Sequence, residues 1–374
     1  MLNSEIIRFG LEVIFWVFLG LEVLFVLFFY YKFVFHRQKA KNKDHFPGVS
    51  VVIPARNEAH NLQQNLPLIL EQDYPDFQVV VVNHASEDDS SFVLQRLEQK
   101  YSNLYVTHIP YSSASFHTKK LALTIGIKAA KHDIIVFTDA DCKPASNQWL
   151  KRIVARYDQE TKIVLGYGGY ERSRGLLDKL VRTETAFIAM QYFGFALRGM
   201  PYMGVGRNIS WRKSFFEQVG GYIRHSHEPS GADDLFVNWF GNGKNTRVEY
   251  SAESFTYSKM PKSFKEWKLQ KQRHFGSFRY YKFWSKFLIT LEPVSRVMMW
   301  ISFLVLIILG RVEYFVILGI VLREVLVYLS FIFSAKKLRE KGLWWFYPIY
   351  DLIQPWLHLA IYVNKSSNRG GRWK

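Results

Sequence analysis

The segment Asp133-Ile134-Ile135-Val136-Phe137-Thr138-Asp139-Ala140-Asp141 decides the fold, because an apolar β-like run ends directly in two acidic residues. In open α/β sheets, ligands bind beyond the carboxyl ends of the strands, and both carboxylates would project there. Carboxylate oxygens suit a hard divalent cation, which can in turn hold a diphosphate. A lone Asp-x-Asp is more often a strand that ends in a solvated turn, so its meaning depends on the rest of the chain.

Apolar runs before this segment alternate with helical segments. Strands are expected at Val49–Pro54, Phe77–Val82, Leu104–Ile109 and Ile134–Thr138, with helices between them at Asn57–Gln72, Ser86–Tyr101 and Thr118–Lys131. Repeated strand–helix units of this length imply a parallel sheet. The runs are almost wholly apolar, as strands covered on both faces should be. The predicted fold class is therefore α/β, with a mostly parallel sheet.

Long apolar stretches flank this region. Ile6–Phe35 has only Glu22 as a charged residue between Val13 and Tyr31, and it is long enough to cross a bilayer. It lacks a small-residue cleavage site, so we expect a retained anchor rather than a signal peptide. Val294–Gly310 and Val312–Phe333 are also expected to be membrane helices.

Two details of the later stretches carry their own predictions. Arg323-Glu324 lies near the middle of an apolar stretch, so it should face protein or pair locally, because facing lipid would be costly. Leu343–Val363 is rich in Trp and Tyr but contains Asp351 and Pro355, and it is either a kinked span or an interfacial segment.

The net charge of +17, from 49 Lys and Arg against 32 Asp and Glu, implies an anionic partner. With membrane segments present, membrane lipids are the simplest partner. No nucleic-acid partner is expected, since zinc-finger spacing, an RNP-like pattern and a compact basic helix are all missing. The single cysteine, Cys142, excludes an intrachain disulfide and a Cys-rich metal cage.

The basic residues around the apolar stretches predict the topology. Lys32, Arg37, Lys39, Lys41 and Lys43 follow the first stretch and place the next segment in the cytoplasm. Residues 336–341 and the basic tail 365–374 can both be cytoplasmic only if the segment between them, Leu343–Val363, does not cross the membrane. The sequence leaves open whether it does.

Candidate ligand-binding residues follow the predicted strands. The turn Pro54–Glu58 would present backbone N–H groups to an anion or a nucleobase. Asn83, after the second strand, could pair with a base edge or belong to an ordinary capping turn. Lys119 lies at the start of a predicted helix, where its positive charge interacts unfavourably with the helix dipole. This position indicates either an anionic partner or a solvated side chain.

Further candidates lie downstream of the Asp-x-Asp. Gly204-Val205-Gly206-Arg207-Asn208 would let the backbone approach a ligand closely. Asp233-Asp234 could supply a general base of raised pKa, although N-capping is the alternative. Arg273, in Gln270–His274, could clamp a leaving diphosphate.

In this order the motifs resemble those of the family 2 inverting glycosyltransferases with a GT-A fold. The closest likeness is to the membrane-bound branch that includes cellulose, hyaluronan and poly-N-acetylglucosamine synthases. The motifs are a Pro-x-x-Asn-Glu turn at 54–58, a V-D-D-x-S-like turn at 82–86, Lys119, Asp-x-Asp at 139–141, a Gly-rich loop at 204–208, the acidic pair at 233–234 and a Gln-x-x-Arg-Trp-like motif at 270–274. Each motif is modest, but the ordered set is specific.

The resemblance implies a role for each candidate. Asp141 would bind Mg²⁺ or Mn²⁺, Asp139 would contact that metal or the ribose, and Asp234 beside Asp233 would deprotonate the acceptor hydroxyl. Donor-binding residues would be Pro54, Ala55, Arg56, Glu58, Asn83, Lys119, Asp139 and Gln270, with Lys119 and Arg273 on the diphosphate. Acceptor-binding residues would be Gly204, Gly206, Arg207, Asn208 and His274.

The resemblance also implies the domain organisation and the partners. Residues 1–36 would be an anchor, 47–260 the GT-A domain, 261–290 an interfacial segment, 291–364 membrane helices and 365–374 a basic tail. The protein would lie in the cell inner membrane with its catalytic domain in the cytoplasm. Its substrates would be a nucleoside-diphosphate sugar, with UDP favoured, and a lipid or glycan acceptor.

Two departures from the family pattern keep alternatives open. Asn83-His84 stands where the family usually has Asp, which bears on the nucleotide, and His274 stands where it has Trp, which bears on processive synthesis. Transfer of a single sugar is at least as compatible with the sequence. The alternatives to a glycosyltransferase are a nucleotidyltransferase and an inactive, membrane-anchored sugar-binding scaffold.

Overall fold

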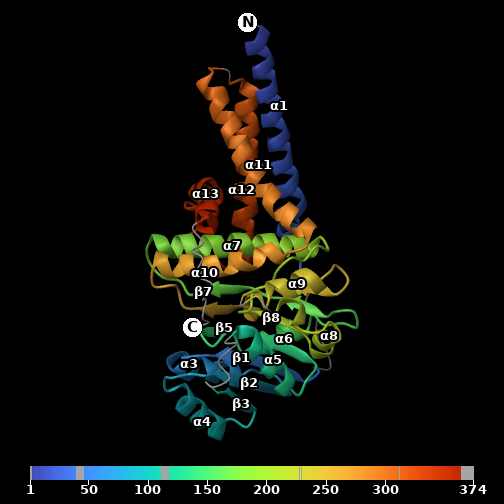
Figure 1. Ribbon diagram of the computed structural model, residues 1–374, viewed down its shortest axis with the longest axis vertical. Helices are drawn as coiled ribbons and strands as arrows, with labels where there is room; N and C mark the ends of the chain where they lie inside the picture. Colours follow the sequence, from blue (N-terminus) through green and yellow to red (C-terminus); the bar gives the residue numbers. More distant parts are fainter. Residues whose placement is uncertain are drawn as a thin grey trace.

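The structure is a computed structural model that describes residues 2–38, 46–110, 118–226, 228, 230–310 and 312–363. The basic residues Lys39, Lys41 and Lys43 and the basic tail 365–374 lie outside the described residues. Figure 1 shows a globular domain from which a bundle of long helices extends, with two helices lying crosswise between the two parts.

A seven-stranded sheet forms the centre of the domain, in the order β3-β2-β1-β4-β8-β6-β9. Its strands are β1 (Val49–Ala55), β2 (Phe77–His84), β3 (Leu104–Ile109), β4 (Ile134–Phe137), β6 (Ile163–Leu165), β8 (Ile209–Arg212) and β9 (Thr246–Val248). The first four pair in parallel, and β8 runs antiparallel to both β4 and β6. The prediction of a mostly parallel sheet, and of its first four strands, is confirmed.

Helices cover both faces of this sheet, which explains the apolar strands. In β1, Val51 packs in one core cluster with the helices α3 (Ala59–Leu70) and α4 (Ser90–Lys100). The next residue, Val52, packs in a second cluster with α5 (Lys119–Ala129). Successive side chains of a strand point to opposite faces, so both must be apolar when both faces are covered.

A second, three-stranded sheet in the order β5-β10-β7 lies beside the first. It consists of β5 (Cys142–Pro144), β10 (Thr256–Ser258) and β7 (Gly168–Tyr170). The sequence did not predict it, because strands of three residues are too short to show a period of two. β5 begins directly after Asp141, so this sheet fixes the far side of the Asp-x-Asp segment.

Three helices among the described residues are long and apolar enough to cross a membrane, at Phe9–Phe35, Phe283–Ile308 and Tyr314–Lys337. The first comprises most of α1 (Leu2–Phe25), the π-helical turn η1 (Val26–Tyr30) and α2 (Tyr31–Phe35); the others are α11 and α12. The three predicted spans are thus present as helices. Leu343–Val363 contains α13 (Tyr347–Val363), which has 17 residues and carries Pro355 in its interior.

The crosswise helices are α7 (Leu176–Leu197) and α10 (Phe264–Ser277), and they lie at the base of the bundle (Figure 1). Shorter helices complete the domain: α6 (Trp149–Val154), α8 (Lys213–Gln218) and α9 (Asp234–Phe240), with 3-10 turns at Ile223–His225, Ala252–Ser254 and Phe278–Tyr280.

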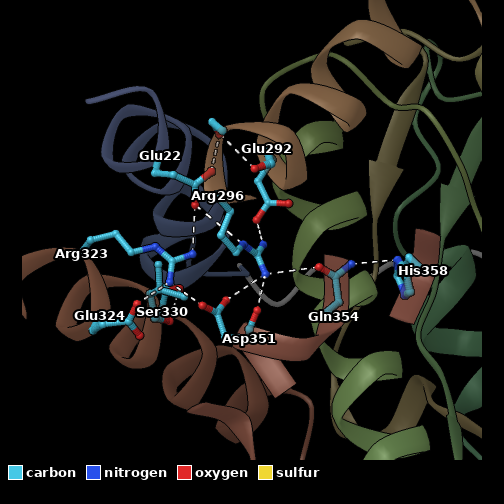
Figure 2. A network of polar contacts seen from close by, with 11 residues as sticks. Glu22, Glu292, Arg296, Arg323, Glu324, Ser330, Asp351, Gln354 and His358 are labelled. Atoms are coloured by element: carbon cyan, nitrogen blue, oxygen red, sulfur yellow. Dashed lines mark hydrogen bonds and ion pairs between the residues drawn. The ribbon is translucent and has the colours of Figure 1, made fainter. Parts of the chain in front are cut away.

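Arg323 in α12 is fully buried, and its guanidinium lies 2.9 Å from Glu22 Oε2 and 2.8 Å from Glu324 Oε1. It also pairs with Asp351. The prediction that Arg323-Glu324 faces protein or pairs locally is confirmed, and Figure 2 shows that the partners of Arg323 come from different helices.

Candidate active site

The turns after β1 and β2 hold each other. Asn57 has a left-handed backbone (φ 54°), its N–H donates to Ser86 Oγ, and its Oδ1 accepts from the N–H of Glu87. The N–H of Ala59 donates to Asp88 Oδ2 at 3.0 Å. Asn57 and Asp88 therefore cross-link the two turns, and Asp88 Oδ1 also accepts from the N–H of Ser90, the first residue of α4. These bonds position Pro54–Glu58 at the carboxyl edge of the sheet.

The Asp-x-Asp segment lies at the same edge. Lys119 Nζ, at the start of α5, lies 2.5 Å from Asp139 Oδ1. Burial alone would lower the pKa of Lys119, but the carboxylates of Asp139 and Asp233 outweigh it and raise that pKa. Lys119 is thus a firmly charged cation between two acidic segments, so the structure brings together three of the predicted residues.

Negative charge is crowded around Asp141. Burial, followed by the neighbouring Asp139, raises the pKa of the Asp141 carboxyl. Burial and the charges of Asp141 and Asp139 likewise raise the pKa of Glu58 to about 7. A divalent cation would relieve this repulsion, so the residues fit the metal that the sequence predicted.

The possible ligand atoms of Asp139, Asp141 and Cys142 lie within 4.8 Å of one another. Cys142 is buried and its thiol donates to Asp141 Oδ1, and burial raises its pKa well above the ordinary value. A protonated thiol is a poor ligand for a hard cation. The two carboxylates are therefore the candidate metal ligands.

The Gly-rich loop contributes Arg207 and Gly206 to this edge. The guanidinium of Arg207 donates to Gly169 O (3.1 Å) and Ser258 Oγ (3.0 Å) of the small sheet and stacks on Tyr170. Its backbone carbonyl accepts from Thr138, which ends the run before Asp139. A Cβ on Gly206 would lie 2.1 Å from Asp233 Oδ2, so only glycine lets this carboxylate approach the loop.

The two carboxylates of the acidic pair have different surroundings. Asp234 accepts from Ser277 Oγ, from Tyr281 OH at 2.8 Å and from its neighbour's N–H at 2.9 Å. Asp233 instead has a buried oxygen, Oδ1, without a hydrogen-bond partner among the described residues. Burial raises the pKa of Asp233 to about 6, with Lys119 opposing this and Asp139 adding to it.

This difference bears on the predicted base. The sequence favoured Asp234, but its hydrogen bonds tie it to the segment after α10 and occupy its oxygens. Burial raises the pKa of both carboxyls, which favours general-base catalysis, but among the described residues only Asp233 keeps a buried oxygen without a partner, and it also interacts with the charges of Lys119 and Asp139. The geometry therefore favours Asp233 as the candidate base.

The Gln-x-x-Arg motif lies on α10. Gln270 Oε1 accepts from Tyr170 OH at 3.0 Å, which joins α10 to the ring on which Arg207 stacks. The side chains of Arg273 and His274 are exposed, and His274 lies within electrostatic range of Arg207. The motif is thus close to the Gly-rich loop, and its arginine is accessible to a ligand.

Five predicted residues lie inside the protein, and two of them, Pro54 and Ala55, are the last residues of β1. Asn83 is buried and donates to Ser91 Oγ, so its amide does not open onto the sheet edge. Asn208 is buried and bonded to Trp149 Nε1 and to the carbonyls of Tyr167 and Ser254. Gly204 packs against Ile209. As the structure stands, Asn83 is not placed to bind a donor, nor Gly204 and Asn208 an acceptor.

Sequence reasoning missed several contributors to the site. They are Tyr170 and Ser258 of the small sheet, Ser277 and Tyr281 after α10, and Lys120, whose buried ammonium donates to Glu228 O at 2.9 Å. None of them lies in a recognisable motif. Only the pairing of segments that are distant in the chain brings them here.

Residues 50–220 match the family described as Glycosyl transferase family 2. This part of the chain is a family 2 glycosyltransferase domain. The match agrees with the family that the order of the motifs predicted for this part of the chain.

The curated relatives bear glycosyltransferase names. The chain is 34% identical over 111 residues to glycosyltransferase AglE of Haloferax volcanii, covering 29% of this chain and 35% of that protein. It is 24% identical over 280 residues to the probable glycosyltransferase YdaM of Bacillus subtilis, covering 68% and 64%. It is 21% identical to the poly-beta-1,6-N-acetyl-D-glucosamine synthase of Staphylococcus epidermidis, covering 63% and 57%. These alignments span less than two thirds of each relative.

Among solved structures, the mannosyltransferase PcManGT from Pyrobaculum calidifontis, in complex with GDP-Man and Mn²⁺, is similar in fold. It superposes with a TM-score of 0.58 at 18% identity, covering 89% of this chain and 100% of that chain. The likeness supports the GT-A fold of the domain and extends to segments beyond the family match.

Proposed function

We propose that the protein transfers a sugar, with inversion, from a nucleoside-diphosphate sugar to a hydroxyl of a lipid-linked or glycan acceptor. One observation carries this proposal: Asp233 has a raised pKa, a buried oxygen that lacks a partner in the described part of the chain, and a position close to the charges of Lys119 and Asp139. It supports a base on one side of the proposed diphosphate site. The family match and the Asp-x-Asp geometry support the same reading.

The donor half of the site would use Asp139 and Asp141 to hold Mg²⁺ or Mn²⁺. When bound, such a cation neutralises a diphosphate and makes it a better leaving group. Lys119 would add a positive charge beside Asp139, and Arg273 would approach from α10 as the diphosphate departs. Pro54–Glu58 would line the nucleoside side, where Glu58 adds to the negative field.

The acceptor half would use Asp233 as the base. Asp233 takes the proton of the acceptor hydroxyl while the hydroxyl oxygen bonds to the anomeric carbon. The bond from that carbon to the diphosphate breaks on the opposite side, so the configuration inverts. Asp234 holds the segment after α10 through Ser277 and Tyr281, and Gly206 leaves room for the Asp233 carboxylate.

The membrane helices support an acceptor that reaches the site from the bilayer or remains attached to it. The net charge of +17 and the basic residues near α2 favour an inner-membrane protein with a cytoplasmic domain. We keep UDP as the favoured nucleotide on the strength of the motif resemblance alone, because Asn83 is buried and supplies no contact. The proposed boundaries remain 1–36, 47–260, 261–290, 291–364 and 365–374.

The test is a screen of nucleotide sugars with the full chain in lipid nanodiscs, reading the nucleotide product. Release of nucleoside diphosphate that requires Mg²⁺ or Mn²⁺ and disappears in Asp233→Asn is the expected result. Release of pyrophosphate would identify a nucleotidyltransferase. Metal-dependent nucleotide binding without turnover of any sugar, with every acceptor extract tried, would identify a sugar-binding scaffold.

A further inference from the structure

Glu184 lies in the middle of α7 and is fully buried, yet no step of the proposed reaction uses it. Its carboxylate has three partners. Lys271 Nζ lies 2.9 Å away, Trp267 Nε1 donates to Oε2 at 3.0 Å, and His358 Nε2 lies 2.9 Å from Oε1. The first two partners come from α10 and the third from α13, so one side chain joins three helices.

Glu184 is ionised in this setting. Burial would raise its pKa, but the charge of Lys271 and the hydrogen bond from His358 outweigh burial and lower the pKa to about 2. A buried charge of this kind is retained at a cost in desolvation, and well-packed apolar residues could often replace it without loss of stability. We therefore expect the Glu184 carboxylate, at the junction of three helices, to help position those helices.

α10 depends on this junction for its orientation. Its sequence, FKEWKLQKQRHFGS, has few apolar residues, and its buried members are Trp267, Lys271, Gly276 and Ser277. Trp267 and Lys271 are four residues apart, so they lie on one face of the helix, and both contact Glu184. Gln270 and His274, also four apart, lie beside this face.

The same junction continues into the membrane helices. His358 Nδ1 bonds to Gln354 Nε2 at 2.8 Å, and Gln354 Oε1 accepts from Arg296 of α11 at 3.2 Å. Arg296 Nη1 lies 3.0 Å from Asp351 Oδ1, and Asp351 and Glu22 both pair with Arg323. Figure 2 shows this chain of contacts running from His358 through Gln354 to the arginines between the helices.

We propose that Glu184 and His358 are positioning residues for transfer: they fix α10 against α7 and α13, and so hold Gln270, Arg273 and His274 at the active site. Seating of α13 in the membrane-helix bundle would then be a condition for turnover. The inference rests on the proposed function, since it assigns the purpose of these contacts to the placement of the Gln-x-x-Arg motif.

The first test needs no substrate. The full chain in nanodiscs is compared with Glu184→Gln and His358→Leu by hydrogen–deuterium exchange. Amides of residues 264–277 should exchange at least about tenfold faster in both variants, while those of β1 and β4 keep their protection. Unchanged protection of α10 in both variants would overturn the inference, whatever reaction the protein catalyses.

The second test separates positioning from general stability. Once the screen has supplied a donor, kcat should fall at least about tenfold in Glu184→Gln and His358→Leu, per folded molecule, with an unchanged affinity for nucleoside diphosphate and Mn²⁺. His358→Gln can still donate to Glu184 and should keep kcat within about threefold. Equal losses of kcat in His358→Gln and His358→Leu would overturn the positioning role. So would a loss of activity that is fully explained by a smaller amount of folded protein.

Glu171→Gln is the matched control. Glu171 also pairs with a lysine, Lys143, at 2.5 Å, but its side chain is 37% exposed. An exposed pair contributes little, so this variant should match the parent in both tests. Failure of the proposed function would appear as absent transfer in the parent protein, whereas failure of this inference would leave the parent active and α10 equally protected in every variant.

Discussion

Asp233→Asn offers the sharpest test of the chemistry, because the two acidic neighbours should respond in opposite ways. Asp233 lies close to the charges of Lys119 and Asp139, and one of its buried oxygens has no partner among the residues that the structure describes, whereas Asp234 is held by Ser277 and Tyr281. Removal of a general base costs about 10²- to 10⁴-fold in rate. We expect Asp233→Asn to lose transfer by that factor while it still binds nucleoside diphosphate with Mn²⁺.

The same substitution should stabilise the protein. The pKa of Asp233 is raised from 3.8 to about 6, so the folded protein holds this proton more tightly than the unfolded chain. Ionisation at pH 7 therefore costs roughly 3 kcal/mol of folding free energy, at about 1.4 kcal/mol per pH unit. This cost grows between pH 3.8 and pH 6 and is fully present above pH 6. Asparagine avoids it, so the unfolding midpoint of Asp233→Asn at pH 7 should rise.

The assay is the initial rate of nucleoside diphosphate release between pH 5 and pH 8, together with thermal unfolding. For the parent protein, kcat/KM should rise tenfold per pH unit up to a pH of about 6 and then level off. Asp234→Asn is the control. It weakens the bonds from Ser277 and Tyr281 but leaves the Asp233 carboxylate in place, so it should keep most of its rate. If Asp234→Asn is inactive and Asp233→Asn is active, Asp233 is not the base, and the prediction of Asp234 from the sequence is correct.

The remaining predictions concern the rest of the site. Asp141→Asn should weaken nucleotide binding at least about tenfold in Mn²⁺ but leave binding in EDTA unchanged, as titration calorimetry would show. Arg273→Ala should lower kcat about 10²-fold with a smaller effect on the acceptor KM, and an unchanged rate would remove it from the mechanism. Gly206→Ala should displace the Asp233 carboxylate and slow transfer, whereas Gly20→Ala, where a Cβ meets nothing within 4 Å, should leave both rate and unfolding midpoint unchanged.

The order and type of the first strands and helices were predictable from the sequence because each strand is buried on both faces. The strand Leu104–Ile109 was predicted to the residue, and β1, β2 and β4 differ by one or two residues at an end. Helix starts were less predictable, because Asn57 and Asp88 also bond across the two turns. Local patterns cannot reveal a partner about 30 residues away.

The site was only partly predictable for the same reason. Lys119, Asp139, Asp141 and Asp233 follow from motifs at the carboxyl edge of the sheet, and the structure brings them together. The sequence could not show which carboxylate of the acidic pair is free, because that depends on Ser277, more than 40 residues later. Nor could it show that Asn83 and Asn208 point inward, since a polar residue after a strand can serve a ligand or a neighbouring backbone.

The link between Glu22 and Arg323 has a consequence for the biogenesis of the protein. The two residues are 301 positions apart, so ribosomes that add about 5–20 residues per second need roughly 15–60 s to supply the second after the first. Throughout this interval α1 carries an acidic residue without its final partners, at a cost of roughly 3 kcal/mol if it faces lipid. A nascent chain arrested before residue 296 should thus be extracted from the bilayer more readily than one arrested beyond residue 351. Such a result would show that the ion pairs of Arg296 and Arg323 hold α1 in the finished protein.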